Sequence, residues 1–112
     1  MTAPNEAGPA SAAAGVQVRS TADGKLTVVG ELSFRTARSA CRDGERALNA
    51  SSVPIVTVDC VGVTRADSAG VAVLIEWLRY ARRAGRELRF ENLPAAVLAI
   101  ARISEVDQLL LA

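Results

Sequence analysis

The stretch VDCVGVTRADSAG, residues 58–70, decides how this chain folds, because a strand leads into it and a helix begins at its end. Residues 53–58 form a short β-branched apolar run of the kind that makes a buried strand. Residues 71–84 carry apolar side chains at helical spacing. Between them, Asp67-Ser68-Ala69-Gly70 presents a carboxylate, a hydroxyl and free backbone donors at a helix start. Because α/β proteins usually place their working surface at such a loop, the sequence predicts an α/β fold that functions at this turn.

Composition limits the size of the protein and its partners. The chain has 112 residues, which suffices for one domain with one modest core. Hydrophobic residues make up 50% and aromatic residues only 4%, so the core is expected to be aliphatic. The net charge of +1 argues against a nucleic-acid partner. No run approaches the ~18 apolar residues needed to cross a bilayer, so no direct membrane insertion is predicted.

The absence of histidine excludes several kinds of site. It removes the usual general base, the usual metal ligand and every Ser-His or Cys-His arrangement. Cys41 and Cys60 lie in different elements without a CxxC spacing, which is typical of small buried side chains in a reducing compartment. Asp59 and Asp67 lack a third ligand, and Asp59 is expected to bind loop backbone donors instead. We therefore predict no catalytic residues, no metal and no cofactor.

The N-terminal residues differ in composition from the rest. Residues 1–15 are mostly Ala, Pro, Gly, Ser and Thr, which predicts a disordered tail before a domain spanning residues 16–112. This segment has neither a basic n-region nor an apolar h-region, so it is not expected to be a signal peptide. A cytoplasmic protein that reaches the membrane only through a partner is the prediction.

The first half of the domain reads as a hairpin followed by a helix. Residues 16–19 and 26–29 alternate like strands, and the Asp-Gly pair within residues 22–25 favours a turn between them. A helix is expected over residues 34–49, with Ser33 as its N-cap. Its buried face would include Phe34, while its arginines would point mostly to solvent.

The second half repeats strand and helix. After the strand that ends at Val58 and the helix that Gly85 ends, residues 87–90 alternate like a strand. Pro94 opens a third helix, and residues 107–111 close the chain with a short strand or helical turn. The order ββαβαβα implies right-handed crossovers and a small mixed sheet of about four strands. About three helices would cover one or both of its faces.

The turn at residues 67–70 allows three interpretations of Ser68. Asp67 is the expected N-cap, and Gly70 lets another backbone approach closely. A nucleophilic Ser68 is disfavoured, because there is no Gly-x-Ser-x-Gly elbow and no histidine. Ser68 can be an ordinary residue of the first helical turn. It can also accept a phosphate, which the helix dipole favours and the neighbouring Asp67 opposes.

The helix that follows has an apolar arc about twice as wide as one core contact needs. Val71, Leu74, Ile75, Leu78 and Ala81 form the obvious core face, and Val73, Trp77 and Tyr80 form an adjoining arc. The second arc either packs on a neighbouring helix or belongs to a partner-binding face, for which Trp and Tyr are typical residues.

These stretches resemble a known family. Val58-Asp59, the Asp67-Ser68-Ala69-Gly70 motif and the aliphatic helix after it resemble the STAS domain of anti-sigma-factor antagonists and sulfate transporters. The element order and residues 30–32 also fit. Within that family the chain is most similar to MlaB-like proteins, through the Glu-Trp-Leu-Arg helix of residues 76–79 and the Asn-Leu-Pro turn of residues 92–94.

The resemblance implies a STAS-type fold and a binding domain without enzymatic activity. MlaB-like proteins bind and support the ATPase of a phospholipid ABC transporter, and through it the permease, to maintain outer-membrane lipid asymmetry. The corresponding contact here would centre on Ser68, with an interface formed by Asp67, Ala69, Gly70, Val73, Trp77 and Tyr80. The protein would then be cytoplasmic and peripheral to the inner membrane.

A different function follows from the antagonist branch of the family. There a partner serine kinase phosphorylates the residue after the Asp, which is Ser68 here, and this controls binding to the anti-sigma factor. Ala69 stands where a second Ser or Thr is common, which departs from that pattern. In isolation, a face meant for a partner can also pair two copies of the chain.

Overall fold

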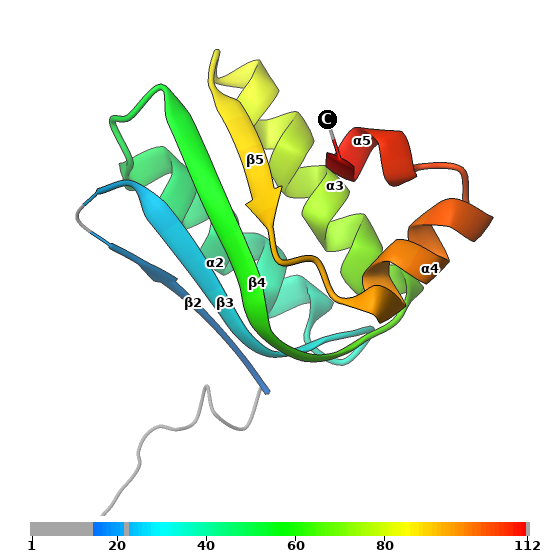
Figure 1. The fold of residues 1–112 in the computed structure, drawn as a ribbon. Coiled ribbons are helices and arrows are strands. Elements are labelled where there is room, and N and C mark those ends of the chain that lie inside the picture. Colours follow the sequence, from blue (N-terminus) through cyan, green and yellow to red (C-terminus); the bar gives the residue numbers. More distant parts are fainter. Residues whose placement is uncertain (1–14, 22, 112) are drawn as a thin grey trace, which may run out of the picture.

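The computed structural model describes residues 15–21 and 23–111, which form a four-stranded sheet with helices on one side (Figure 1). The predicted tail, residues 1–15, lies outside the described residues apart from Gly15. The elements follow one another as β2 (Val16–Ser20), β3 (Lys25–Leu32), α2 (Ala37–Ala50), β4 (Ile55–Ala66), α3 (Ser68–Arg83), β5 (Glu87–Glu91), α4 (Ala95–Ile103) and α5 (Asp107–Leu111).

The sheet has the order β2-β3-β4-β5 and mixes two kinds of pairing. β2 and β3 form the predicted antiparallel hairpin, whose turn contains Gly24 at a φ of 84°. β3 pairs with β4, and β4 with β5, in parallel. The predicted mixed α/β fold is therefore confirmed. Among the described residues, no helix is long and apolar enough to cross a membrane.

β4 is longer than predicted. It does not end at Val58 but continues through the expected loop to Ala66, paired with β3. The pairing shifts register between Thr27 and Val29 and again between Gly30 and Glu31. Such irregularities bend a strand and increase its twist. The extension carries the chain to the start of α3 without a loop.

α2 begins later than predicted. The helix starts at Ala37 and its N-cap is Thr36, so Ser33 is not the cap. The Thr36 hydroxyl donates to the carbonyl oxygen of Glu31 at 2.7 Å and accepts the backbone N–H of Ser33 at 3.0 Å. Residues 33–36 therefore form a turn. Phe34 lies in this turn with 82% of its surface exposed, not on the buried face of a helix.

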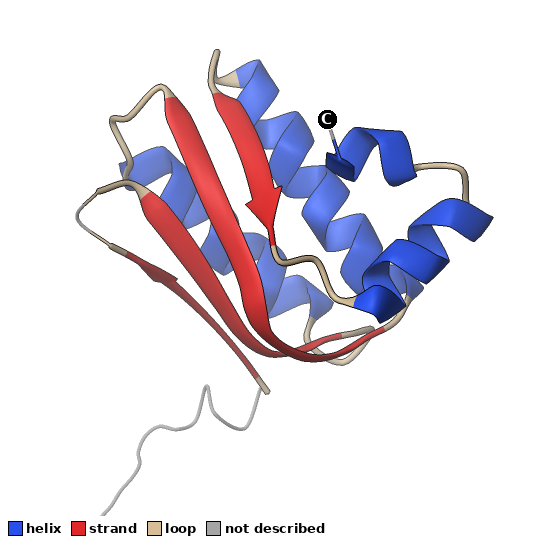
Figure 2. Cartoon of the chain, in the orientation of Figure 1, coloured by secondary structure: helices blue, strands red, loops and turns tan. Residues whose placement is uncertain are grey.

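The helices are arranged asymmetrically around the sheet. α2 and α3 cover the same face, α4 and α5 lie beyond the β5 edge, and the opposite face is open to the viewer (Figure 2). Gly85, at a φ of 74°, follows α3 as predicted. Pro94 caps the N-terminus of α4, and residues 107–111 form a short helix rather than a strand.

The core lies between the sheet and the two helices. Its buried side chains are almost all aliphatic, as the composition predicted, and Trp77 is its largest member. Trp77 packs at Gly44 of α2, where an added Cβ would lie 2.1–2.5 Å from three indole atoms. Gly44 therefore lets α2 and α3 come close together at the Trp77 side chain.

Candidate functional site

The start of α3 is fixed by the Asp67 side chain. One carboxylate oxygen accepts the backbone N–H of Gly70 at 3.1 Å, which is the predicted N-cap geometry. The other accepts the backbone N–H of Phe34 at 3.0 Å. The hydrogen bond from Phe34, followed by that from Gly70, lowers the pKa of Asp67 below its ordinary value. Asp67 therefore joins the turn of residues 33–36 to the first turn of α3.

Ser68 is the first residue of α3, and its side chain is exposed. It stands at the positive end of the helix dipole, directly after the Asp67 carboxylate. Ala69, which follows, is half-buried. A partner protein can therefore reach both Ser68 and Ala69, and the Ser68 hydroxyl is accessible to modification.

Gly70 has a different role from its neighbours. It is buried, and an added Cβ would lie 2.0 Å from the carbonyl oxygen of Leu32. That carbonyl accepts the backbone N–H of Asp67 at 3.1 Å. The close backbone approach expected at Gly70 is thus made to β3 of the same chain. Gly70 therefore positions the turn, and because it is buried it has little surface of its own to offer a partner.

The second arc of α3 is mostly internal. Trp77 is fully buried and cannot contact a partner in this structure, whereas Val73 is 4% exposed and has only a small surface to offer. Of the two interpretations, packing on a neighbouring helix describes Trp77, whose ring lies against Gly44 of α2, and a binding face that includes Val73 and Tyr80 stays a prediction. Tyr80 is half-buried, and the Arg83 guanidinium lies 5.8 Å from the centre of its ring. Of Val73, Trp77 and Tyr80, Tyr80 is therefore the most exposed.

Phe34 is the residue that sequence reasoning missed at this site. Its backbone is bound to Asp67, and its exposed ring lies at the same end of the sheet as Ser68. Phe34 is one of the two phenylalanines of the chain, and 82% of its surface is exposed. Thr36 was the available signal, because threonine is among the residues preferred at the N-cap position. In the structure its hydroxyl makes no capping hydrogen bond and binds Glu31 and Ser33 instead.

Comparison with known proteins identifies the family. Residues 16–112 match the family described as the MlaB STAS domain. The chain belongs to this family of STAS domains. No curated protein matches it in sequence.

Solved structures of the same fold include two forms of one STAS protein. The chain is similar to the unphosphorylated anti-sigma factor antagonist SpoIIAA, with a TM-score of 0.66 and 14% identity over 86% of this chain and 85% of the other. It is also similar to the phosphorylated form of SpoIIAA, a cell fate determinant of Bacillus. That match has a TM-score of 0.62 and 13% identity, over 86% of this chain and 88% of the other. At these identities the likeness concerns the fold.

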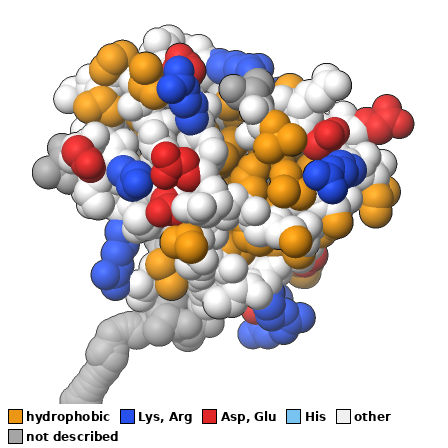
Figure 3. Space-filling model, viewed as in Figure 1, with side chains coloured by type: hydrophobic (Ala, Val, Ile, Leu, Met, Phe, Trp, Pro, Cys, Tyr) orange, Lys and Arg blue, Asp and Glu red, His pale blue; other side chains and the backbone are white. Residues whose placement is uncertain are grey.

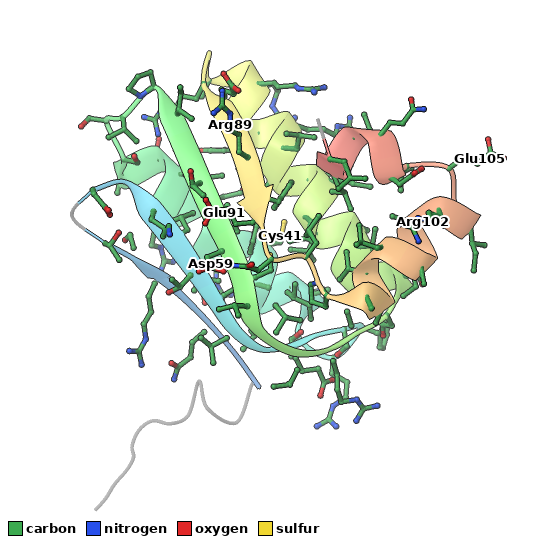
Figure 4. The ribbon with its side chains drawn as sticks, viewed as in Figure 1. Cys41, Asp59, Arg89, Glu91, Arg102 and Glu105 are labelled. Carbon is green, nitrogen blue, oxygen red and sulfur yellow. The ribbon has the colours of Figure 1, made fainter. Side chains whose placement is uncertain are left out.

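The open face of the sheet in this STAS domain carries charged side chains together with the exposed hydrophobic residues Val29, Ile55 and Val61. Asp59 accepts the Val61 backbone N–H at 3.0 Å, as expected, and the Asn92 side-chain amide at 2.9 Å. The hydrogen bond from Asn92, followed by that from the Val61 N–H, lowers the pKa of Asp59 below its ordinary value. Glu91 lies opposite Asp59 across β4 and β5 and forms an ion pair with Lys25 at 3.3 Å (Figure 4). Charged side chains gather over the sheet, and hydrophobic ones nearer α4 and α5 (Figure 3).

Asp59 and Asp67 each bind other groups of the chain, and burial affects both cysteines. Asp59 and Asp67 are engaged by different donors, and within the described residues no three metal-ligating side chains come together. Burial raises the pKa of Cys60 to about 12. Burial is the main cause that raises the pKa of the Cys41 thiol, and its hydrogen bond to the Glu45 carboxylate is the next. Both thiols are therefore protonated at neutral pH. STAS domains are typically binding or regulatory domains.

Proposed function

We propose that this STAS domain is an accessory subunit of an Mla-type phospholipid ABC transporter. It binds and supports the ATPase, and through the ATPase the permease, in the maintenance of outer-membrane lipid asymmetry. The protein is then cytoplasmic and peripheral to the inner membrane through its partner. The match of residues 16–112 to the MlaB family supports this assignment.

The exposed start of α3 is the surface that carries the proposal. Ser68 is exposed and Ala69 half-buried, and Phe34, whose surface is 82% exposed, is tied to this turn by the hydrogen bond from its backbone N–H to Asp67. Large aromatic side chains at the centre of an interface contribute strongly to binding. We place Ser68, Ala69 and Phe34 in the contact with the ATPase, with Asp67 as the residue that positions them.

Gentle affinity purification from detergent-solubilised source cells tests the partner. We expect an ABC ATPase with its permease to copurify with the tagged protein, as identified by mass spectrometry. A purification that yields no ATPase would refute the transporter proposal.

Matched variants then test the surface. Phe34→Ala should weaken ATPase binding about tenfold or more, because it removes an exposed aromatic contact. Ile103→Ala is the control, since Ile103 is 84% exposed and is the last residue of α4. Ser68→Ala should leave binding largely intact, whereas Ser68→Glu should weaken it. Equal binding by Phe34→Ala and Ile103→Ala would remove Phe34 from the interface.

A second function is that of an anti-sigma-factor antagonist switched by phosphorylation at Ser68. The exposed hydroxyl at a helix N-terminus favours it, and so does the likeness to SpoIIAA. In this case a cognate serine kinase and ATP should add one phosphate, and Ser68→Ala should prevent the mass increase. No mass increase with such a kinase would exclude this function.

A further inference from the structure

A groove runs between α2 and α3 from the Ser68 end of the molecule. It has a volume of about 550 Å³. Its floor consists of small or compact side chains from both helices, namely Ala37, Cys41, Ala69, Ala72 and Val73. From Ala37 to Glu45, the groove follows α2 for about 12 Å, or roughly two helical turns. Small side chains on a floor of this length allow the backbone of a further helix to approach closely.

The charges on the rim divide the groove into two ends. Arg38 and Arg42, both exposed, lie on the α2 wall toward the Ser68 end. Glu45 and Glu76 lie at the other end, near Cys41, and help to raise the pKa of that thiol. Glu76 is paired with Arg79 at 3.5 Å, and Glu45 accepts a hydrogen bond from the Cys41 thiol at 3.4 Å. The charge that stays open to a partner is therefore mainly positive and lies at the Arg38 end.

The helix dipoles strengthen this polarity. Each of α2 and α3 connects two parallel strands of the same sheet, so the two helices run in the same direction. Their N-termini, which carry partial positive charge, lie together at the Arg38 end. Within the described chain, Arg38 makes no ion pair, and Arg42 has only its neighbour Asp43, at 3.7 Å. The positive end is left to be neutralised by another molecule.

We propose that this groove binds an amphipathic helix of the partner. The apolar stripe of that helix lies on the alanine and cysteine floor, and its acidic side chains face Arg38 and Arg42. A basic side chain faces Glu45 at the other end, where Glu76 is already paired with Arg79. An extended segment would leave unpaired backbone groups over an apolar floor, whereas a helix satisfies its own. The inference rests on the proposed function only for the identity of the partner, the ATPase.

Synthetic helices test the chemistry of the groove without the ATPase. Two stapled helices share one Ala/Leu stripe and carry either glutamates or lysines beside it, and each is titrated into the full ¹⁵N-labelled chain. The glutamate helix should shift the amide signals of residues that line the groove and bind about tenfold more tightly than the lysine helix. Equal binding of the two helices, shifts confined to other surfaces, or no shifts would overturn the proposal.

Charge reversal and a steric block provide matched controls. The double variant Arg38→Glu/Arg42→Glu should remove the preference for the glutamate helix, while Arg46→Glu should not. Arg46 is exposed one turn further along α2 and lines a hollow beside β2 instead. Ala72→Tyr should block the groove, and Ala99→Tyr, at an exposed alanine of α4, should not. Equal effects of the groove variants and their controls would contradict the inference.

The same variants separate this inference from the proposed function. A wild-type chain that binds the glutamate helix but no ATPase would refute the transporter function and support the groove. A wild-type chain that binds the ATPase, with undiminished binding by Arg38→Glu/Arg42→Glu, would support the function and refute the groove as its docking site.

Discussion

The contact between Gly44 and Trp77 predicts a large effect from one added methyl group. In Gly44→Ala, the new Cβ would lie 2.1, 2.2 and 2.5 Å from three atoms of the indole ring. Real Cβ atoms do not approach other heavy atoms this closely, so the ring or a helix must move. Trp77 is fully buried and rigid, which makes this movement unfavourable.

The magnitude follows from two opposing terms. Alanine is favoured over glycine within a helix by about 1 kcal/mol. Overpacking a core costs about 1–3 kcal/mol, and three contacts below 3 Å place this site at the upper end. We therefore expect Gly44→Ala to lower the free energy of unfolding by about 2 kcal/mol. Urea denaturation followed by far-UV circular dichroism measures this change without relying on tryptophan fluorescence.

Replacement of Trp77 supplies the control. Within the described chain, the buried Trp77 indole N–H has no hydrogen-bond partner. Trp77→Phe removes that donor, worth about 1–3 kcal/mol when unpaired, and leaves a cavity of comparable cost. Trp77→Phe also makes room for the added methyl group. The double variant Gly44→Ala/Trp77→Phe should therefore lose about 1 kcal/mol less free energy of unfolding than the sum of the two single losses. Unchanged stability of Gly44→Ala, or strict additivity, would refute the proposed packing.

Three further predictions concern the α3 start and the buried thiol. Gly70→Ala should lower the free energy of unfolding by about 3 kcal/mol, because the added Cβ would lie 2.0 Å from a backbone carbonyl oxygen. Gly85→Ala should lower it by only about 1 kcal/mol, because its added Cβ would meet nothing within 4 Å and the cost is that of the positive φ alone. Thermal unfolding that ranks them in the reverse order would contradict this. Because the pKa of Asp67 is lower in the folded chain, its carboxylate stabilises the fold above its ordinary value of 3.8, and this contribution is lost as the pH falls through the folded value. Asp67→Asn should therefore narrow the difference in Tm between pH 7 and pH 3, and an unchanged difference would exclude this role. With a pKa of about 12, Cys60 should resist iodoacetamide at pH 8 until urea is added, and rapid labelling of the native chain, detected by mass spectrometry, would show the thiol to be accessible.

Local patterns in the sequence were enough to predict the topology. The Asp-Gly turn, the alternating strands and the helical run after Gly70 each follow from short-range preferences, and they agree with the observed hairpin and parallel crossovers. Asp67 as N-cap and Gly85 after the helix are equally local and were both predicted correctly. Residues 59–66 were read as a loop because glycine and charged residues interrupt the apolar run. Pairing with β3, which is non-local, makes them a strand.

The errors at the candidate site have a shared physical cause. Helical periodicity indicates that a side chain is apolar and on a given arc, but not what covers that arc. Trp77 is buried because a glycine 33 positions earlier leaves room for its ring, and no pattern within α3 reveals this. Phe34 is exposed because Thr36 delays the helix start through hydrogen bonds to residues 31 and 33. Both outcomes depend on contacts between segments.

The buried Trp77 nevertheless bears on binding, although it does not touch the surface. Its ring and Gly44 bring α2 and α3 together in the middle of their length. On the Ser68 side of this contact the two helices carry only small side chains toward each other, so the space between them stays open as the groove. A large residue at Gly44 or a small one at Trp77 would change the spacing of the helices that form both walls. Loss of partner binding in a Trp77 variant would therefore report the geometry of the groove, whereas variants of the exposed residues Phe34, Ser68, Arg38, Arg42 and Ala72 report direct contact.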